Sequence, residues 1–312
     1  MKTLCILLAA ALLCLSPAAM AQETAPLHVG ALKGPTAMGL AEQMARSEGG
    51  ADYAFTLAAS PDALLPALAR GELDLACLPV NLAAILYANT QGAVRVVAVN
   101  TLGVLYILQR GEGIKTLADL AGRRLYSSGK ASTPEYALNH LLERAGVQDV
   151  DIQWKSEHAE VLASLLLDPE GAALLPQPFV AAALRQNPDI RVALDLNALW
   201  EALGEGPMIT GVTVARAELI ERQPERLAVF LKDYAVSVDY VNNHNEEAAQ
   251  LMERFGIISA PVALDALPFC GITLVTGAEM ARALQAFYQA MFTQDPRATG
   301  GSLPDEAFYY LP

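Results

Sequence analysis

The sequence predicts an α/β protein of two Rossmann-like lobes, whose parallel-rich sheets are joined by two crossing strands. Short apolar segments alternate with segments of helical spacing over the first two thirds of the chain. This alternation is typical of parallel sheets that are covered by helices on both faces. A second observation predicts two such sheets, because the same strand–helix pattern recurs after a constant interval of 97 residues.

The repeat is visible in residues of the same type at matched positions: Lys33 and Lys130, Thr36 and Thr133, Leu78-Pro79 and Leu175-Pro176. Strands are expected at 27–32, 53–58 and 73–78 in the first copy, and at 124–127, 151–155 and 172–175 in the second. We infer that one βαβ module is used twice and builds two equivalent sheets.

Two segments are predicted to cross between the lobes. The first consists of apolar runs at 94–99 and 104–108, separated by the break Asn100-Thr101-Leu102-Gly103, and the second is 206–214. These crossings divide the mature chain into lobe one, residues 22–101 and 210–312, and lobe two, residues 102–209. The pattern after the second crossing is helical, at 218–230, 234–242, 246–255 and 278–292. The closing Phe308-Tyr309-Tyr310 is expected to pack onto lobe one.

Composition and charge exclude several classes of protein. With 53% hydrophobic and 18% charged residues, the chain is globular rather than disordered. A net charge of −13 argues against nucleic acid and against anionic lipid surfaces as partners. Cys77 and Cys270 lie in apolar, strand-like contexts, which leaves either one disulfide or two buried thiols.

The first 21 residues have the order of a secretory signal peptide. Lys2 supplies the positive start, 4–15 is apolar, and Ala19-Met20-Ala21 is a cleavage site of the small-x-small type. An apolar run of this length is too short to span a bilayer as a stable helix. Leu13 before Cys14 lacks the small residue that a lipid anchor requires. We therefore expect an exported, periplasmic chain that begins after Ala21.

A ligand site is predicted where the first strand of each copy meets its helix. LKGPTAMG turns on Gly34 and Pro35 and starts its helix at Thr36, and GKASTPEY contains Ser132 and Thr133 at the matching place. Both threonines can cap their helices or donate a hydroxyl group, and Gly34 and Ser132 let a ligand approach the backbone. Two helix N-termini facing one cleft would bind an anionic or strongly polar small molecule.

Further candidates each carry an alternative interpretation. Lys33 and Lys130 either face the ligand or are solvated loop charges. Asn81 follows the first Leu-Pro strand end and Gln177 follows the second, so each is either a cleft residue or part of a helix cap.

Enzymatic motifs are incomplete or missing. Ser127-x-x-Lys130 matches a pattern of serine acyl enzymes, but the Ser-Asp-Asn and Lys-Thr-Gly partners of that pattern are absent. The sequence contains no nucleophile elbow, Walker loop, dinucleotide fingerprint or His-Glu-x-x-His. Its four scattered histidines argue against a metal site. We expect neither catalysis nor a metal or cofactor.

Several stretches resemble periplasmic substrate-binding proteins of ABC importers: LHVGALKGPTAMGL, GELDLACLPVNLAAILY, VRVVAVNTLGVLYIL, GKASTPEYALNHLL, SEHAEVLASLL, LPQPFVAAAL and GGSLPDEAFYY. The resemblance covers the mature chain and is to the nitrate, taurine and aliphatic-sulfonate type, which includes binders of thiamine pyrimidine precursors. It implies a type II two-lobed fold that closes on one small solute. It also implies delivery of that solute to an inner-membrane permease driven by a cytoplasmic ATPase. We expect a monomer.

The resemblance implies which residues lie at the cleft: Gly34, Pro35, Thr36, Asn81, Asn100, Thr101, Ser132, Thr133 and Thr210. Lys33 and Gln177 are added from their places in the repeat. The pyrimidine binders carry a cysteine-rich stretch and more cleft aromatics, which this sequence lacks. A related two-lobed protein with another task stays an alternative, either a sensor ectodomain partner or a pyrimidine-synthesising enzyme of the same fold.

Overall fold

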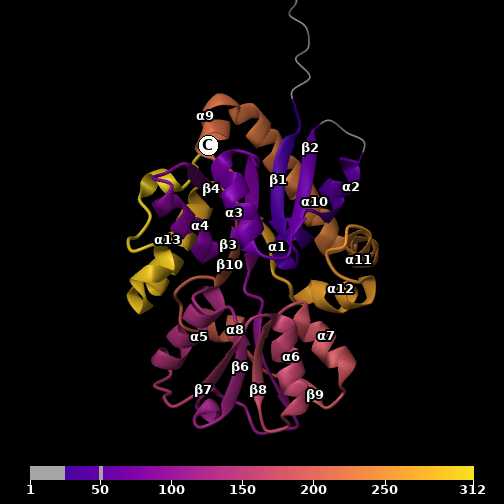
Figure 1. Cartoon of the computed structure of the whole chain (residues 1–312), viewed down its shortest axis with the longest axis vertical. Helices are drawn as coiled ribbons and strands as arrows, with labels where there is room; N and C mark the ends of the chain where they lie inside the picture. The colour runs from indigo at the N-terminus through magenta and orange to yellow at the C-terminus, as the bar shows by residue number, and fades with distance from the viewer. Residues whose placement is uncertain (1–24, 49–51) are drawn as a thin grey trace, which may run out of the picture.

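The chain forms two α/β lobes that lie end to end in the computed structural model, which describes residues 25–48 and 52–312 (Figure 1). Each lobe contains one mixed sheet with helices on its faces, as the sequence predicts. The predicted signal segment, from Lys2 to Ala21, lies outside the described residues.

Six strands form the sheet of lobe one, in the order β11-β4-β10-β3-β1-β2. Their bounds are Leu27–Leu32 for β1, Tyr53–Ala58 for β2, Leu75–Pro79 for β3, Val94–Leu102 for β4, Ile209–Arg216 for β10 and Ile272–Val275 for β11. Strand β1 pairs in parallel with β2 and β3, whereas β10 is antiparallel to β3 and β4.

Helices from both ends of the chain cover this sheet (Figure 1). The first group is α1 at Pro35–Met38, α2 at Ala41–Arg46, α3 at Pro61–Arg70 and α4 at Val80–Asn89. The second group is α9 at Ala217–Arg222, α10 at Pro224–Asn243, α11 at Asn245–Arg254, α12 at Ala260–Ala266 and α13 at Gly277–Gln294. Short 3-10 turns lie at Leu267–Phe269, Pro296–Thr299 and Glu306–Phe308.

Five strands form the sheet of lobe two, in the order β7-β6-β8-β5-β9. Their bounds are Leu105–Arg110 for β5, Arg124–Ser128 for β6, Asp151–Lys155 for β7, Ala172–Pro176 for β8 and Ile190–Asp195 for β9. The helices are α5 at Thr133–Arg144, α6 at His158–Leu167, α7 at Phe179–Gln186 and α8 at Leu196–Glu201, with a 3-10 turn at Leu117–Leu120.

The predicted repeat is confirmed by the strand pairing. Strand β1 lies between its parallel neighbours β2 and β3, and β6 lies in the same way between β7 and β8. The next strand along each sheet, β10 or β5, is antiparallel. Even the matched residues before α3 and α6, Ser60 and Glu157, share φ −138° and ψ 155°.

The crossing segments differ in detail from the expected ones. Strand β4 continues to Leu102, so Asn100 and Thr101 belong to the strand and not to a break. Only Gly103 and Val104 separate β4 from β5. Strand β10 begins at Ile209, later than the expected start at 206. The lobe boundaries drawn from the sequence stay a prediction.

The expected helices at 218–230 and 234–242 are wrong. The structure ends α9 at Arg222 and runs α10 without interruption from Pro224 to Asn243. Proline has no N–H group to donate and fits the first turn of a helix, so Pro224 starts a new helix. Of the polar residues between the two expected helices, Lys232 is exposed and Asp233 bonds to Arg46 and Tyr53, and neither interrupts the helix.

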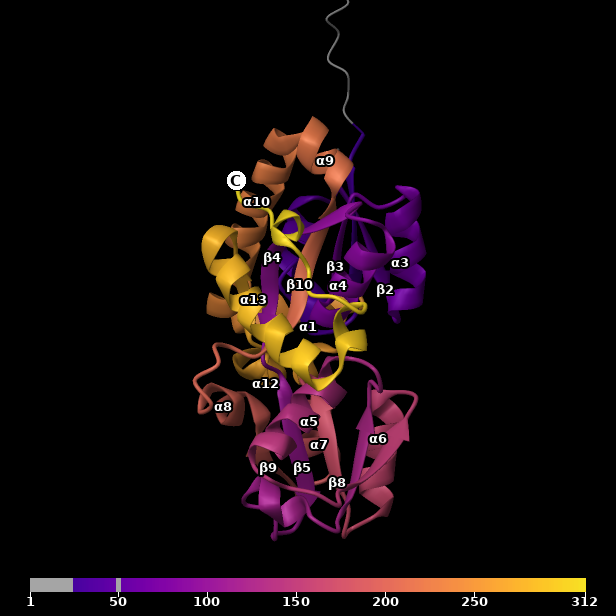
Figure 2. The same cartoon turned by 90° about the vertical axis from the view of Figure 1, so that its left-hand side faces the viewer.

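Two groups of buried side chains stabilise lobe one. Phe230 and Tyr234 of α10 pack with Met38 in one of them. The other contains Phe287 of α13 and continues into lobe two through Trp200, whose ring centroid is 5.2 Å from that of Phe287. The lobes are therefore packed together on the α13 side, which faces the viewer in Figure 2.

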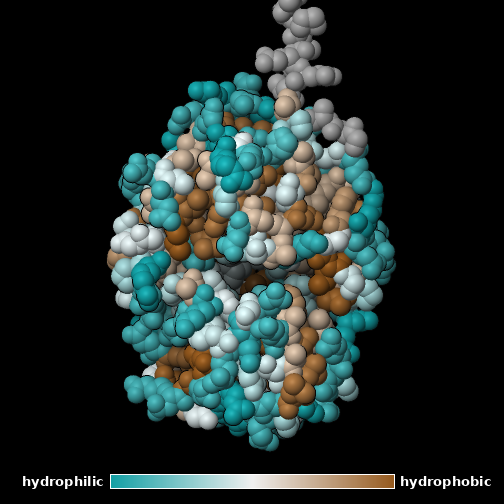
Figure 3. Space-filling model, in the orientation of Figure 1, coloured by the Kyte–Doolittle hydropathy of each residue, from teal (hydrophilic) through white to brown (hydrophobic). Residues whose placement is uncertain are grey.

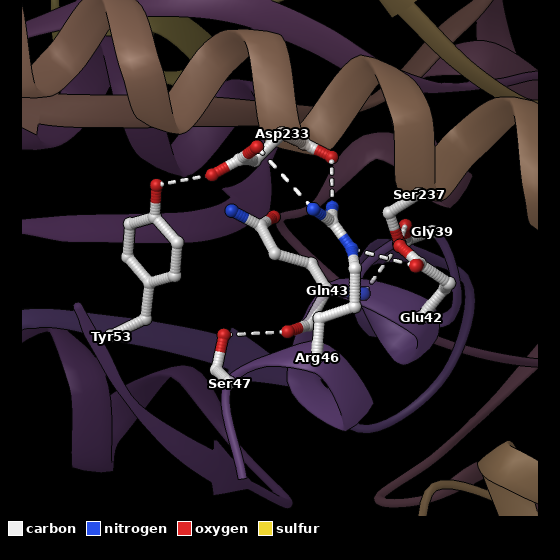
Figure 4. Close-up of polar contacts among 8 residues, drawn as sticks. All are labelled: Gly39, Glu42, Gln43, Arg46, Ser47, Tyr53, Asp233 and Ser237. Atoms are coloured by element: carbon white, nitrogen blue, oxygen red, sulfur yellow. Dashed lines mark hydrogen bonds and ion pairs between the residues drawn. The ribbon is translucent and has the colours of Figure 1, made fainter. Parts of the chain in front are cut away.

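A polar cluster ties α2 to α10 within lobe one (Figure 4). The Arg46 guanidinium donates to the carbonyl oxygen of Asp233 at 3.0 Å, and the Tyr53 hydroxyl donates to the Asp233 carboxylate at 2.8 Å. The N–H of Gln43 donates to Ser237 Oγ at 3.0 Å. The side-chain amide of Gln43 is buried among these groups and has no hydrogen-bond partner within the described residues. These bonds hold α2, and with it the preceding α1 turn, against the longest helix of the lobe.

The C-terminal aromatics pack onto lobe one, as predicted. The Phe308 side chain is fully buried, with its ring 4.9 Å from that of Tyr87 and 5.9 Å from that of Tyr288. The N–H of Tyr310 donates to the Val96 carbonyl at 2.9 Å, which adds a backbone bond beside β4.

Cys77 and Cys270 are buried free thiols, which decides between the two alternatives left by the sequence. Burial raises the pKa of Cys77 to about 11 and that of Cys270 to about 12. Among residues 25–48 and 52–312, no helix is both long and apolar enough to cross a bilayer.

We predict that Phe308→Ala lowers the free energy of unfolding by about 3–5 kcal/mol, because it leaves a cavity between two tyrosine rings. Leu311→Ala is the matched control, since the Leu311 side chain is 58% exposed. Urea denaturation followed by circular dichroism measures both. Equal, small losses in the two variants would show that the C-terminal segment does not stabilise lobe one.

Candidate functional site

The predicted site lies at the boundary between the lobes. Strands β1 and β3 of lobe one and β6 and β8 of lobe two end there, so the loops that follow them face each other (Figure 1). The surface is hollowed at this boundary (Figure 3). Ligands of open α/β sheets bind outside the carboxyl ends of the strands. Two sets of such ends here share one cleft.

The turn after β1 is built on Gly34, whose φ of 124° is accessible only to glycine without strain. No atom lies within 4 Å of the position that a Cβ of Gly34 would occupy, so the backbone is open to a ligand. Pro35 begins α1, and Thr36 lies inside this short helix rather than at its cap. The Thr36 hydroxyl donates to the carbonyl of Leu32 at 3.1 Å. The predicted capping by Thr36 is wrong.

The matching turn after β6 also corrects the capping prediction. Ser132 occupies the N-cap of α5, and Thr133 is its first residue. The Ser132 hydroxyl donates to the Gly129 carbonyl at 2.6 Å and makes no bond to the helix. The Thr133 hydroxyl donates across the cleft to Asn81 Oδ1 at 3.1 Å. Thr133 is therefore a contact between the lobes and not a cap.

Asn81 is the lobe-one side of that contact. It is the second residue of α4 and is fully buried. Its Nδ2 approaches the Ala131 carbonyl at 3.5 Å, at the limit of a hydrogen bond. One amide thus contacts the turn of the opposite lobe from both ends. The structure brings predicted residues of the two lobes within hydrogen-bond reach of each other.

The backbone N–H groups of Thr36 and Thr133 are a further repeated feature. No hydrogen-bond acceptor for either group is found within the described residues, and the first helix N–H groups that have an acceptor are those of Ala37 in α1 and Glu135 in α5. Backbone N–H groups without partners are strong donors for anionic oxygens. Each lobe therefore offers one such donor at the same position of the repeat.

Asn100 is the extra residue of a β-bulge in β4. Thr101 pairs with Gly211 and Val99 pairs with Val212, so three residues of β4 oppose two of β10. Bulges re-aim side chains and are frequent beside functional sites. This bulge turns Asn100 toward Thr101, whose hydroxyl donates to Asn100 Oδ1 at 2.9 Å.

Gly211 was not among the residues predicted from the sequence. A Cβ at this position would lie 2.5 Å from Asn100 Oδ1, 2.8 Å from Thr36 Cγ2 and 2.9 Å from Thr101 Oγ1. Three predicted residues from two separate segments therefore meet beside one glycine. The signal in the sequence was the isolated glycine within an apolar strand, which indicates a close approach.

Thr210 and Gln177 serve the framework of the cleft. The Thr210 hydroxyl donates to the Leu102 carbonyl at 2.6 Å and so joins the two crossing strands. Gln177 is buried, its Oε1 accepts from the N–H of Ala181 at 3.2 Å, and its own N–H donates to the Val104 carbonyl at 2.9 Å. Both residues lie at the boundary between the lobes, but their side chains make hydrogen bonds to backbone groups of the protein.

Lys33 and Lys130 are both exposed, and no hydrogen bond or ion pair within the described residues involves either ammonium group. They follow β1 and β6, one in each lobe. Their position leaves them able to attract an anion to the cleft without holding it in a fixed geometry.

A cluster on lobe two was passed over by the sequence analysis. Ser128 Oγ lies 2.5 Å from Nδ1 of His158, and the His158 ring packs 4.7 Å from that of Phe179. Ser128 ends β6, and His158 and Phe179 follow β7 and β8, all at the cleft end of the sheet. Burial lowers the pKa of His158 to about 4, so the ring is neutral at neutral pH. The available signal was the place of His158, which matches Pro61 in the repeat.

Other contacts join the lobes around the cleft. Arg185 of α7 pairs with Asp265 of α12 at 2.5 Å, and the Tyr106 hydroxyl donates to the Phe269 carbonyl at 3.3 Å. On the opposite side, α13 lies against α5. The structure is thus a closed arrangement of the two lobes.

The Ser127 and Lys130 pattern does not assemble into a nucleophile and a base. Ser127 is fully buried, and its hydroxyl donates to the Ser128 carbonyl at 3.2 Å, whereas the Lys130 side chain is exposed. Within the described residues, no group of three potential ligands is placed to hold a metal ion.

A family model described as the periplasmic substrate-binding protein of the phosphonate ABC transporter matches residues 36–266. The chain belongs to this family. Comparison with curated protein sequences gives no match. The family match covers part of each half of lobe one and all of the sheet of lobe two, and it includes Asn81 and Thr133 on the two sides of the cleft.

Solved structures share the fold. An ABC transporter protein from Parabacteroides distasonis has 22% identity and a TM-score of 0.77, covering 91% of this chain and 98% of that one. The periplasmic aliphatic sulphonate binding protein SsuA from Escherichia coli has 22% identity and a TM-score of 0.74, covering 92% of each chain. The alkanesulfonate-binding protein SsuA from Xanthomonas axonopodis pv. citri, bound to MOPS, has 18% identity and a TM-score of 0.67, covering 86% of this chain and 93% of that one.

These findings agree with the family inferred from the sequence and favour the receptor over the sensor partner or the pyrimidine-related enzyme. The substrate-binding member of an ABC importer binds a small solute in the cleft and delivers it to the permease. The fold, the cleft and the family are therefore all consistent with binding and delivering a small solute.

We predict that His158 makes the protein less stable at acidic pH. Its folded pKa of about 4 lies below the ordinary value of 6.5, so the unfolded chain binds more protons between these values. The free energy of unfolding should therefore fall, as pH drops from about 6.5 to 4, by on the order of 1–3 kcal/mol from this residue. Urea denaturation at pH 7 and pH 4.5 measures the difference.

His158→Gln should lose this part of the pH dependence, and His244→Gln should keep it, because the His244 ring stacks on Tyr240 at an exposed site. The same pH dependence in all three proteins would contradict a buried neutral His158.

Proposed function

We propose that this chain is exported to the periplasm, closes on a small molecule with a phosphonate or sulfonate headgroup, and delivers it to an ABC permease in the inner membrane. The family description names phosphonate, and the two SsuA proteins of the same fold are described as sulfonate binders. A phosphonate and a sulfonate share a tetrahedral, oxygen-rich, anionic headgroup. The proposal concerns this shared chemistry.

The observation that carries the proposal is the contact of Asn81 in lobe one with the turn after β6 in lobe two. The unpartnered N–H groups of Thr36 and Thr133 come from opposite lobes, and Asn81 and Thr133 are within hydrogen-bond reach of each other. A single small headgroup can therefore contact both lobes at once. A ligand that contacts both lobes stabilises the closed state, so its binding shifts the equilibrium between open and closed lobes toward the closed one.

We assign the ligand site to eleven residues, of which Gln177 and Thr210 hold its backbone: Lys33, Gly34, Pro35, Thr36, Asn81, Asn100, Thr101, Ser132, Thr133, Gln177 and Thr210. Gly211 and His158 join this set from the structure. The protein acts as a monomer without a cofactor or metal, with lobe one at 22–101 and 210–312 and lobe two at 102–209. It binds its solute and releases it unchanged.

A screen with matched headgroups tests the ligand class. Ethylphosphonate, ethanesulfonate and propionate carry the same ethyl group, so differences in melting temperature report the headgroup. We predict that a phosphonate or sulfonate raises the melting temperature and that propionate does not, because a ligand stabilises the state that binds it. Stabilisation by propionate alone, or by none of the three, would contradict the proposed class.

Thr36→Val and Thr133→Val extend this test to the site. Each should weaken binding of the stabilising probe by only about 0.5–1.5 kcal/mol, measured by calorimetric titration, because each hydroxyl already has a protein partner and valine keeps the backbone N–H group. The double variant should lose less than the sum, because both groups hold one headgroup. Thr90→Val is the matched control, since the Thr90 hydroxyl donates to the carbonyl four residues earlier, as that of Thr36 does.

A further inference from the structure

The turn after β6 contains one residue in a strained backbone conformation. Ala131 has φ 58°, in the left-handed region that disfavours residues with a Cβ atom. It is the third residue of a four-residue turn, which the N–H of Ser132 closes by donating to the Gly129 carbonyl at 3.1 Å. A positive φ at this position normally requires glycine or asparagine, and the matched residue of lobe one is Gly34. Strain of this kind persists where neighbouring groups hold it in place.

A carboxylate from the following helix holds Ala131. The N–H of Ala131 donates to Glu135 Oε2 at 2.6 Å. Glu135 is the third residue of α5, and in an ordinary capping box it would accept from the N–H of the N-cap residue Ser132. That N–H is already donated to Gly129, so Glu135 accepts from the residue one position earlier. The direction of this bond is fixed, because a backbone N–H only donates and an ionised carboxylate only accepts.

The shape of this turn determines what lobe two presents to lobe one. The Ala131 carbonyl faces Asn81, whose Nδ2 lies 3.5 Å away, and the Thr133 hydroxyl donates to Asn81 Oδ1 at 3.1 Å. A carbonyl can only accept, so the NH₂ end of the Asn81 amide faces Ala131 and its oxygen end faces Thr133. A change of φ at Ala131 would reorient the start of α5 relative to β6 and disturb both contacts with Asn81.

We propose that Glu135 is a positioning residue for ligand binding: its carboxylate keeps Ala131 left-handed and so holds the turn of lobe two in the shape that meets Asn81 when the lobes close. This inference rests on the proposed function and deepens it. Glu135 acts through the turn, because a carboxylate repels the oxygens of an anionic headgroup. Lobe one needs no such residue, since Gly34 adopts a positive φ without strain and Met38 stands at the place that matches Glu135.

The test compares Glu135→Gln with Glu135→Ala, because both lose the negative charge but only glutamine keeps an oxygen that can accept from Ala131. The two variants are compared with each other rather than with the wild type, since loss of a negative charge by itself favours an anion. Ethylphosphonate and ethanesulfonate are titrated by calorimetry. Whichever probe binds should bind Glu135→Gln about two- to tenfold more tightly than Glu135→Ala, the range of one neutral hydrogen bond. Equal affinities would overturn the proposal.

A second substitution separates positioning from a general effect of the Glu135 side chain. Ala131→Gly makes the positive φ accessible without strain, so in its presence the difference between Glu135→Gln and Glu135→Ala should largely disappear. Asp119→Asn and Asp119→Ala are the matched control pair and should bind the probe equally. Asp119 accepts from two backbone N–H groups in the segment before β6, at the end of the sheet away from the cleft. An undiminished difference, or an equal one between the Asp119 variants, would overturn the proposal.

A measurement on the ligand-free protein tests the positioning role by itself. The HN–Hα coupling of Ala131, assigned from its loss in Ala131→Gly, reports the φ angle of this residue. It should be the same in Glu135→Gln as in the wild type and should change in Glu135→Ala. An unchanged coupling in Glu135→Ala would overturn the positioning role even if a probe binds. A changed coupling in a protein that binds neither probe would reject the proposed ligand class and leave the positioning role supported.

Discussion

The antiparallel pairing of β4 with β10 is the interaction on which the cleft depends. These are the two strands through which the chain passes between the lobes, and they lie side by side within one sheet. Their pairing fixes where both crossings leave lobe one. The Thr210 hydroxyl donates to the Leu102 carbonyl and so holds the end of that pairing. Any opening of the lobes must bend the chain just beyond this point. The bulge at Asn100 lies inside the same pairing, so the hinge and the candidate site share one framework.

The repeat explains why a single local sequence contributes two halves of a site. A βαβ module places the loop after its first strand at the carboxyl end of the sheet. Two copies facing each other place two such loops at one cleft, where Thr133 of lobe two donates to Asn81 of lobe one. The remaining elements differ between lobes because they have different tasks. Helix α13 packs on both lobes, and its contact from Phe287 to Trp200 holds one side of the molecule together.

The sequence predicted the strands well because apolar runs between turn residues are a local signal. Strand β1 and strand β7 have the expected bounds, and the repeat predicted that the two sheets share one βαβ arrangement. The capping roles of Thr36 and Thr133 failed because a cap depends on where the first hydrogen bond of the helix closes. That bond is set by Gly34 in one turn and by Ser132 in the other. From the local sequence alone, Gly34 or Thr36 in the first turn, and Ser132 or Thr133 in the second, is an acceptable N-cap.

The parts of the site that the sequence could not predict depend on tertiary partners. A bulge is one residue of mismatch between two strands, and nothing in β4 alone distinguishes Asn100 as the extra residue. His158 becomes a neutral cleft residue only because Ser128 and Phe179 surround it. Thr213, the hydrogen-bond partner of the Asn100 amide, is separated from it by more than a hundred residues in sequence. In each case the chemistry of the residue was visible, but its partner was not.

The closed structure also constrains how a ligand can gain affinity. The hydroxyl of Thr133 already donates to Asn81, and that of Thr36 already donates to Leu32. A ligand that takes either hydrogen exchanges one bond for another, and such an exchange has a small net free energy. The groups that gain most are the repeated N–H groups, which have no hydrogen-bond partner within the described residues. Affinity should therefore come mainly from these backbone donors, which can bind anionic oxygens without losing an existing bond.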